Sequence, residues 1–302
     1  MVASVTGTPE TRSLAATIFP PRSLTAWFPV ALAVVAFVWL FFSPARGLVH
    51  DWLKDDEASY GLLLFPVAIW LAWREGLRDD RRPDVMLGST LLIGAVLLRA
   101  LGSLAAEFFS QRFSVWLAIV GVIVFYFGWR QVKAWWLPLA LLALSIPFPA
   151  MITNFLAIPL QYRASQLGTA LIEWRHIPVR ATGNVISIPG QQLFVAEACS
   201  GLRSLTALIA LGVMVGGMWL TTIPARIFLL LITIPVAVVI NGVRVFLTAF
   251  LMYFVDPGLG KGFQHESQGW GLFLLSLLIL SGITFLVRFV ETRVVRRWGK
   301  DA

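Results

Sequence analysis

Charged residues are scarce in this sequence of 302 residues: Asp, Glu, Lys and Arg make up 13% of it, whereas 58% is hydrophobic. Soluble domains usually carry about 25% charged residues. Half that density does not cover the surface of a water-soluble fold, and the mean hydropathy of +0.80 points the same way. The composition therefore excludes an ordinary soluble enzyme, a disordered chain and a DNA-binding module. It predicts an all-α polytopic membrane protein.

Cysteine is scarcer still, because Cys199 is the only one in the chain. A single cysteine excludes an intrachain disulfide and a cysteine-rich metal centre. We therefore expect neither a structural metal nor a cofactor. The 13 Trp and 22 Phe residues are consistent with aromatic belts at the two membrane surfaces.

Long apolar runs dominate the sequence, and a membrane-spanning helix needs about 20 such residues. We predict eight spans, with the second the shortest: Ala26–Phe42, Tyr60–Trp73, Val85–Leu104, Phe113–Trp129, Ala134–Ala150, Leu202–Leu220, Ile227–Phe254 and Gly269–Val290. The eight spans would form a single integral membrane domain over residues 1–302.

The basic residues between the spans gather on one side. That side carries Arg12, Arg22, Arg74, Arg78, Arg81, Arg82, Arg130, Lys133, Arg226, Arg293, Arg296, Arg297 and Lys300. Short loops rich in Lys and Arg stay in the cytoplasm. We therefore predict cytoplasmic tails at residues 1–25 and 291–302, and both termini on the inner side.

The connection over residues 151–198 then lies on the outer side. Ile152–Trp174 mixes apolar and polar residues, which is typical of a helix lying in the outer interface, although a ninth, poorly formed span also fits. Arg180–Val195 contains β-branched residues and the turn pair Pro189-Gly190, which predict a short extracytoplasmic β-hairpin. The hairpin leads directly to Cys199.

Three residues stand out on this outer side. Cys199 would open the sixth span, where free N–H groups and the helix dipole stabilise a thiolate; a small buried hydrophobe is the plainer interpretation. Arg244, with Asn241 one turn before it, lies about 25 Å into a core of about 30 Å, counted from Ile227. A charge there is costly, so it is either functional or snorkels outward. His265, in the predicted loop before the last span, is either a proton carrier or merely solvated.

Together, a lone thiol, a guanidinium and an imidazole at one membrane face follow the logic of a cysteine–histidine nucleophile with a fixed cation. Two more residues are candidate supports. Arg203 lies one helical turn beyond Cys199 and would either add positive potential or have a structural role, and Glu197 would orient His265 or Arg244.

At these residues the sequence resembles the exosortase/archaeosortase family. The resemblance rests on Ala198-Cys199-Ser200-Gly201-Leu202-Arg203, on Asn241-Gly242-Val243-Arg244 and on His265. It implies a membrane-embedded cysteine protease and transpeptidase (a thiol hydrolase acting on peptide bonds), with Cys199, Arg244 and His265 as the catalytic residues. It also implies substrates that are exported proteins ending in a Pro-Glu-Pro-like motif, a hydrophobic helix and a basic cluster. The implied location is the bacterial inner membrane, with the site facing the periplasm and a link to exopolysaccharide production.

Two other functions compete with this interpretation. A small transporter would use an intramembrane arginine in an anion path, but it predicts polar residues in several spans, and these spans are nearly free of ionisable groups. A non-catalytic subunit of exopolysaccharide export predicts that Cys199 is dispensable.

The predicted orientation has a direct test. A membrane-impermeant thiol reagent added to intact cells with a permeable outer envelope should label Cys199, because the residue is predicted to lie outside the inner membrane. The Cys199→Ala chain serves as the unlabelled control. Labelling that occurs only after the cytoplasm is opened would contradict the orientation.

Overall fold

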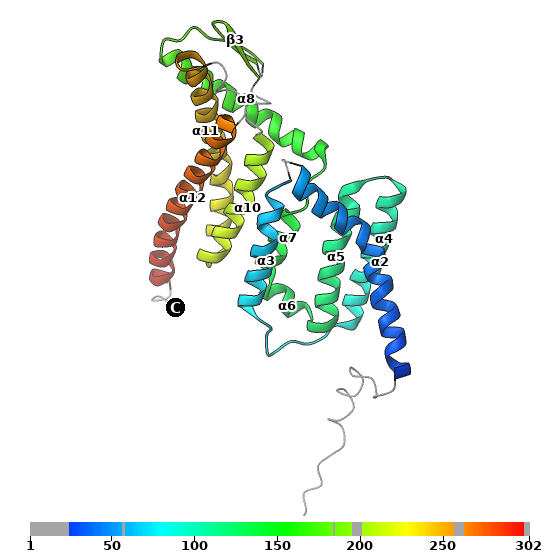
Figure 1. Cartoon of the computed structure of the whole chain (residues 1–302). Helices are drawn as coiled ribbons and strands as arrows, with labels where there is room; N and C mark the ends of the chain where they lie inside the picture. The colour runs from blue at the N-terminus through cyan, green and yellow to red at the C-terminus, as the bar shows by residue number, and fades with distance from the viewer. Residues whose placement is uncertain (1–23, 56–57, 184, 195–200, 257–262, 299–302) are drawn as a thin grey trace, which may run out of the picture. The chain divides into compact units, whose positions relative to one another are not determined.

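A computed structural model describes residues 24–55, 58–183, 185–194, 201–256 and 263–298. The helices are α2 (Leu24–Lys54), α3 (Gly61–Glu75), α4 (Val85–Leu104), α5 (Phe108–Phe127), α6 (Trp129–Ala134), α7 (Trp136–Leu144), α8 (Ala150–Trp174), α10 (Gly201–Trp219), α11 (Ile223–Phe254) and α12 (Phe263–Trp298). The strands are β1 (Arg180–Thr182), β2 (Val185–Ile188) and β3 (Gln191–Phe194). Figure 1 shows these elements along the chain.

Four of the described helical segments are long and apolar enough to cross a membrane. They are α4, α5, α11 and the Gly271–Arg293 part of α12. They support the prediction of a mostly helical, polytopic membrane protein. The count of eight spans stays a prediction.

One predicted span is wrong in its extent. Ala134–Ala150 was expected to be a single helix, but α6 ends at Ala134 and α7 covers only Trp136–Leu144. Pro147 and Pro149 prevent α7 from continuing, because proline cannot donate the helical hydrogen bond and it holds the preceding residue in an extended conformation. At 1.5 Å per residue, α7 is about 14 Å long, which is under half of the apolar core of a bilayer.

The backbone contacts divide the chain into two compact units, residues 1–47 and residues 48–302, and the boundary falls inside α2. The described part of the first unit contains the first predicted span, Ala26–Phe42, which is helical where the structure describes it. Most of its described large apolar side chains are exposed, including those of Val35 and Trp39. Such an apolar surface is typical of a helix that meets lipid.

Within the second unit, α4 and α5 form a closely packed antiparallel pair. Each begins with an acidic cap: Asp84 accepts a hydrogen bond from the Leu87 N–H (2.9 Å), and Glu107 accepts from Phe109 and Ser110 (2.8 and 2.6 Å). Gly88 allows the close approach, because a Cβ there would lie 2.5 Å from the Cα of Phe125. The caps fix where the two helices begin, and the glycine fixes how near they pack.

The loop between α3 and α4 is held against α6 by a buried amide. The Gln131 side chain is fully buried, accepts a hydrogen bond from the Arg78 N–H (2.9 Å) and donates one to the Gly76 carbonyl (3.1 Å). Asp80 accepts hydrogen bonds from Arg78 and Arg130, and the bond from Arg78 lowers the pKa of the Asp80 carboxyl below its ordinary value. The loop that carries Arg78, Arg81 and Arg82, three of the basic residues predicted to be cytoplasmic, is therefore held in place.

The helix α7 connects the first helices of this unit to the last ones. Leu137 and Leu141 of α7 share a core cluster with Leu64 and Leu71 of α3 and with Ala210 of α10. The Arg226 guanidinium of α11 also lies over the Trp136 ring, 4.6 Å from its centroid. Although α7 is short, its buried side chains pack against both α3 and α10.

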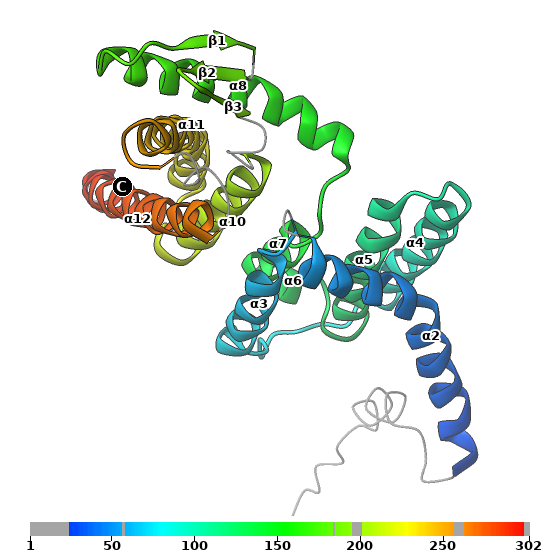
Figure 2. The same cartoon turned by 45° about the horizontal axis from the view of Figure 1, so that its top comes forward.

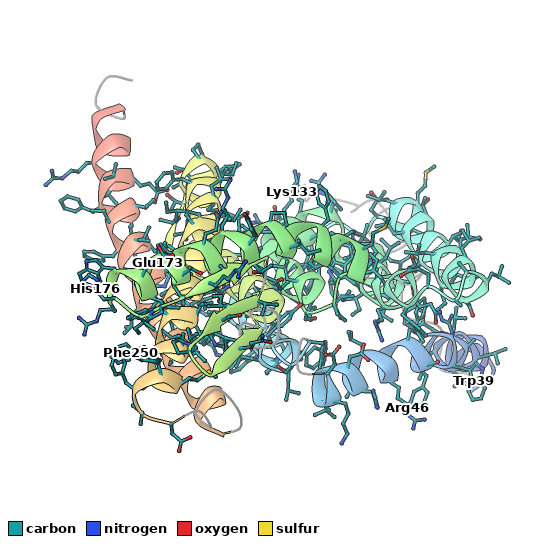
Figure 3. The ribbon with its side chains drawn as sticks, turned by 90° about the horizontal axis from the view of Figure 1, so that it is seen from above. Trp39, Arg46, Lys133, Glu173, His176 and Phe250 are labelled. Carbon is teal, nitrogen blue, oxygen red and sulfur yellow. The ribbon has the colours of Figure 1, made fainter. Side chains whose placement is uncertain are left out.

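The helix α8 and the sheet pack together on α11. Ile172 of α8, Ile186 and Leu193 of the sheet, and Val245 and Ala249 of α11 belong to one buried cluster. Figure 2 shows the strands lying along α8, and Figure 3 labels Glu173 and His176 at the end of this helix and Phe250 of α11. The predicted helix over Ile152–Trp174 is confirmed as a helix, whereas its position in the interface stays a prediction.

The sheet has one strand more than the predicted hairpin. Its order is β1-β2-β3 and both pairs are antiparallel. Gly183, with a φ of +62°, belongs to a first turn that the sequence analysis overlooked, and Pro189-Gly190 forms the second turn, as predicted. Glycine adopts this left-handed conformation without a steric cost.

Candidate active site near the starts of α10 and α12 and the end of α11

The six residues singled out in the sequence are described to different degrees. Cys199 and Glu197 lie outside the described residues. Arg203 belongs to α10 and His265 to α12, but only the backbone of each is described. Asn241 and Arg244, on α11, are described in full.

The placement of His265 corrects the sequence analysis. It was expected in a loop before a helix starting at Gly269, but α12 already begins at Phe263. The prediction followed the apolar run, and residues 263–268 are mostly polar. Backbone hydrogen bonding continues a helix through polar residues when no proline interrupts it. His265 therefore lies in the first turn of a helix.

The C-terminal half of α11 carries a polar face. Asn241 and Thr248 are buried and Arg244 is half-buried between them. The spacing of three and four residues places all three on one side of the helix. The Nε atom of Arg244 is shielded from solvent. A charge with this much burial interacts more strongly with a neighbouring anion than an exposed one does.

The helix α8 crosses this face at close range. A Cβ on Gly168 would lie 2.5 Å from the Cγ1 of Val245, and a Cβ on Gly242 would lie 2.6 Å from the Cδ2 of Leu167. Two glycines, one on each helix, therefore allow the approach beside Arg244.

Two buried hydroxyls flank that crossing point on α8. Ser165 and Thr169 are 1% and 9% exposed, and in the described part of the chain their hydroxyl oxygens have no hydrogen-bond partner. Sequence reasoning missed both, because it weighed the longer polar side chains of this segment. The signal was the spacing Ser165, Gly168 and Thr169, which places three small residues on one helical face.

The register of α10 on α11 sets the level of the predicted nucleophile. A Cβ on Gly212 would lie 2.8 Å from the Thr233 Oγ1, and one on Gly216 would lie 3.0 Å from the Leu229 Cδ2. Moving four residues toward the N-terminus of α10, from Gly216 to Gly212, therefore corresponds to moving four residues toward the C-terminus of α11, from Leu229 to Thr233. Continued to the start of α10, this antiparallel register places Gly201 level with Arg244. By this count, the beginning of α10 and Arg244 lie at about the same level along the two helices.

The register of α12 on α11 is fixed at the opposite end. The Glu291 carboxylate accepts hydrogen bonds from the N–H groups of Thr221 (3.1 Å) and Thr222 (2.6 Å), directly before α11 begins. Counting outward along both helices places His265 level with Thr248. This is one turn, or about 6 Å, from the level of Arg244. Leu280 and Ala237, which share one core cluster, lie four residues, or about one turn, away from this register.

The arrangement suits the stabilisation of an anion. A helix N-terminus offers unpaired N–H donors and a partial positive charge, and a half-buried guanidinium adds a full charge at the same level. A thiolate or an oxyanion is stabilised by both. Within the described ranges, no three His, Cys, Asp or Glu side chains form a group that could hold a metal ion.

The fold and this site define a polytopic helical membrane protein with a polar centre at one end of its last three described helices. The chain matches the family model of the transmembrane exosortases over residues 52–282, which is well over half of its length and includes all six candidate residues. It belongs to this family. Membership suggests a membrane transpeptidase with a role in the sorting of exported proteins. Neither the curated proteins nor the solved structures match the chain.

The crossing of α8 and α11 predicts opposite effects of alanine at two helical glycines. Gly282→Ala should leave the melting temperature in detergent unchanged or raise it, because nothing lies within 4 Å of the added Cβ and alanine favours helix. Gly168→Ala should lower the melting temperature, because the added Cβ meets Val245. The expected loss in the free energy of unfolding is about 1–3 kcal/mol. Equal shifts for the two variants would contradict the close approach.

Proposed function

We propose that this exosortase is a cysteine endopeptidase and transpeptidase that cleaves the C-terminal sorting tails of exported proteins at the outer face of the membrane. The observation that carries the proposal is the shared level of Gly201, which opens α10 two residues after Cys199, and of Arg244 on α11. Family membership supports the reaction class. The second register, which brings His265 to within a turn of that level, supports a third catalytic residue.

The chemistry has two steps. The Cys199 thiolate attacks the carbonyl carbon of the scissile peptide bond, and the tetrahedral intermediate collapses to a thioester as the C–N bond breaks. His265 protonates the leaving amine, which departs with the tail. A second nucleophile, water or an acceptor amine, then attacks the thioester and gives its proton to His265, and the sulfur leaves as the thiolate.

Arg244 acts on the negative charge in both steps. Its level beside the first N–H groups of α10 suits an oxyanion hole made of backbone donors and a guanidinium. Asn241 is buried one turn away on the same face and is proposed to position the guanidinium. Arg203 adds positive potential on α10, and Glu197 orients His265 or Arg244.

The proposed setting is the bacterial inner membrane, with eight spans and both tails in the cytoplasm. The arginine-containing loop between α3 and α4 would then face the cytoplasm, and the sheet and the start of α10 would face the periplasm. Substrates reach the site from the outer side, carrying a short motif, a hydrophobic helix and a basic cluster.

Removal of the thiol tests the nucleophile. In membranes containing the full chain and an exported reporter with such a tail, Cys199→Ala and Cys199→Ser should lower the cleavage rate by about 10³-fold or more. The uncleaved reporter should accumulate while the amount of inserted protein stays unchanged, as measured by immunoblot. Cleavage at the wild-type rate by Cys199→Ala would show that another residue attacks, or that the chain is a non-catalytic subunit.

Replacement of the guanidinium tests the cation. Arg244→Lys should lose most of the cleavage activity, because a compact ammonium group cannot reproduce the planar donor fork, and Arg244→Ala should lose about 10²–10³-fold. Arg163→Lys, a change at an exposed arginine of α8, is the matched control and should keep full activity. Full activity of Arg244→Lys would mean that charge alone suffices at this position.

A further inference from the structure

The three-stranded sheet is packed on one face only. Ile186 and Ile188 of β2 and Leu193 of β3 are buried against α8 and α11, whereas Gln192, on the opposite face of β3, is exposed. Figure 2 shows the strands side by side along α8. Helix packing therefore covers one face of the sheet and leaves its two edge strands to be examined separately.

The register shows which backbone groups point away from the sheet. Ile188 and Gln191 flank a two-residue turn and are paired, as are Thr182 and Val185 at the other turn. In antiparallel pairs such flanking residues exchange their hydrogen bonds, and residues at the next position turn their N–H and C=O groups outward. The outward-facing residues are then Gln192 and Phe194 on the edge formed by β3, and Ala181 on the edge formed by β1. The β1–β2 and β2–β3 registers agree on which residues of β2 bond to β1 and which bond to β3.

Both edges have free hydrogen-bonding groups. In the part of the chain that the structure describes, neither Ala181 nor Gln192 bonds to a backbone group beyond the sheet. An unpaired strand edge is a template for another extended chain, which adds as a further strand. The two edges differ in their distance along the chain from the candidate nucleophile.

The edge formed by β3 lies nearer along the chain to the candidate nucleophile than the edge formed by β1. This strand ends at Phe194, five residues before Cys199, so at most about 17 Å of extended chain separate them. A peptide added beside β3 would lie about 5 Å from that strand. A peptide added beside β1 would lie three strand spacings, or about 14 Å, away from β3.

We propose that the outer edge of β3 binds the substrate as an added β-strand, and that this strand is the extended segment directly before the hydrophobic tail of an exported protein. The inference rests on the proposed function. The chain direction sets the orientation: β3 leads into α10, which would enter the membrane from the outer side, and the substrate likewise runs from the outer side into its membrane tail. The substrate strand therefore pairs parallel to β3 and its tail helix continues beside α10.

Strand addition has a consequence for recognition. Backbone N–H and C=O groups supply the affinity, and alternate substrate side chains face the same side. The motif before the cut should therefore tolerate many residues at every second position, while each residue whose N–H bonds to β3 must keep that N–H.

The test uses binding, which does not depend on catalysis. The full chain carrying Cys199→Ala is purified in detergent, and its affinity is measured for a fluorescent peptide that contains a Pro-Glu-Pro motif, an apolar helix and a basic cluster. Gln192→Pro in this background should weaken binding about tenfold or more, because proline removes the outward N–H and its ring blocks the edge. Ala181→Pro makes the same change at the opposite edge and should bind normally.

A second measurement covers the case in which Gln192→Pro fails to fold. Peptides N-methylated one at a time at the residues before the cut other than proline should lose affinity only where the methylated N–H faces β3, which is at alternate positions, when they bind the Cys199→Ala chain. Equal affinity of Gln192→Pro and Ala181→Pro chains, or a uniform N-methyl series, would overturn strand addition. Cleavage of the peptide by wild-type and Cys199→Ala chains at one rate would instead overturn the proposed function, and the affinities would still decide strand addition.

Discussion

The antiparallel packing of α10 on α11 is the contact on which the candidate site depends. Gly212 and Gly216 let the two helices approach at Thr233 and Leu229, and these contacts fix the register. A slip by one residue would move the start of α10 by about 1.5 Å and turn it by about 100° relative to Arg244. In the proposed reaction the beginning of α10 and the guanidinium act on the same charge, so their alignment matters more than either group alone.

The sequence predicts the bounds of a helix well where a capping residue marks the end of that helix. The helix α4 has the predicted bounds, Val85–Leu104, because Asp84 caps it and an apolar run fills it. The start of α12 was missed because apolar content marks the part of a helix that meets lipid, whereas His265 lies in a polar turn beyond it. The length of α7 was overestimated because prolines ended the helix inside an apolar run.

The candidate site was predictable in its residue types and less so in its surroundings. The cost of a charge in a membrane helix singled out Arg244, and its spacing singled out Asn241. No periodicity in the sequence indicated that α8 would bring Ser165 and Thr169 to the part of α11 that carries Arg244. Their position depends on how α8 and α11, which are far apart in the sequence, cross. The two glycines at the crossing, Gly168 and Gly242, are explained only by the packing between α8 and α11.

The carboxylate of Glu291 lies at the opposite end of these helices, yet it bears on the candidate site. By accepting hydrogen bonds from Thr221 and Thr222 it ties the first turn of α11 to α12. From there to Arg244 the helix is about 33 Å long. The stretch of α11 between this anchor and the guanidinium has a fixed length, so the position of the charge along the packed helices is set by the number of residues between them.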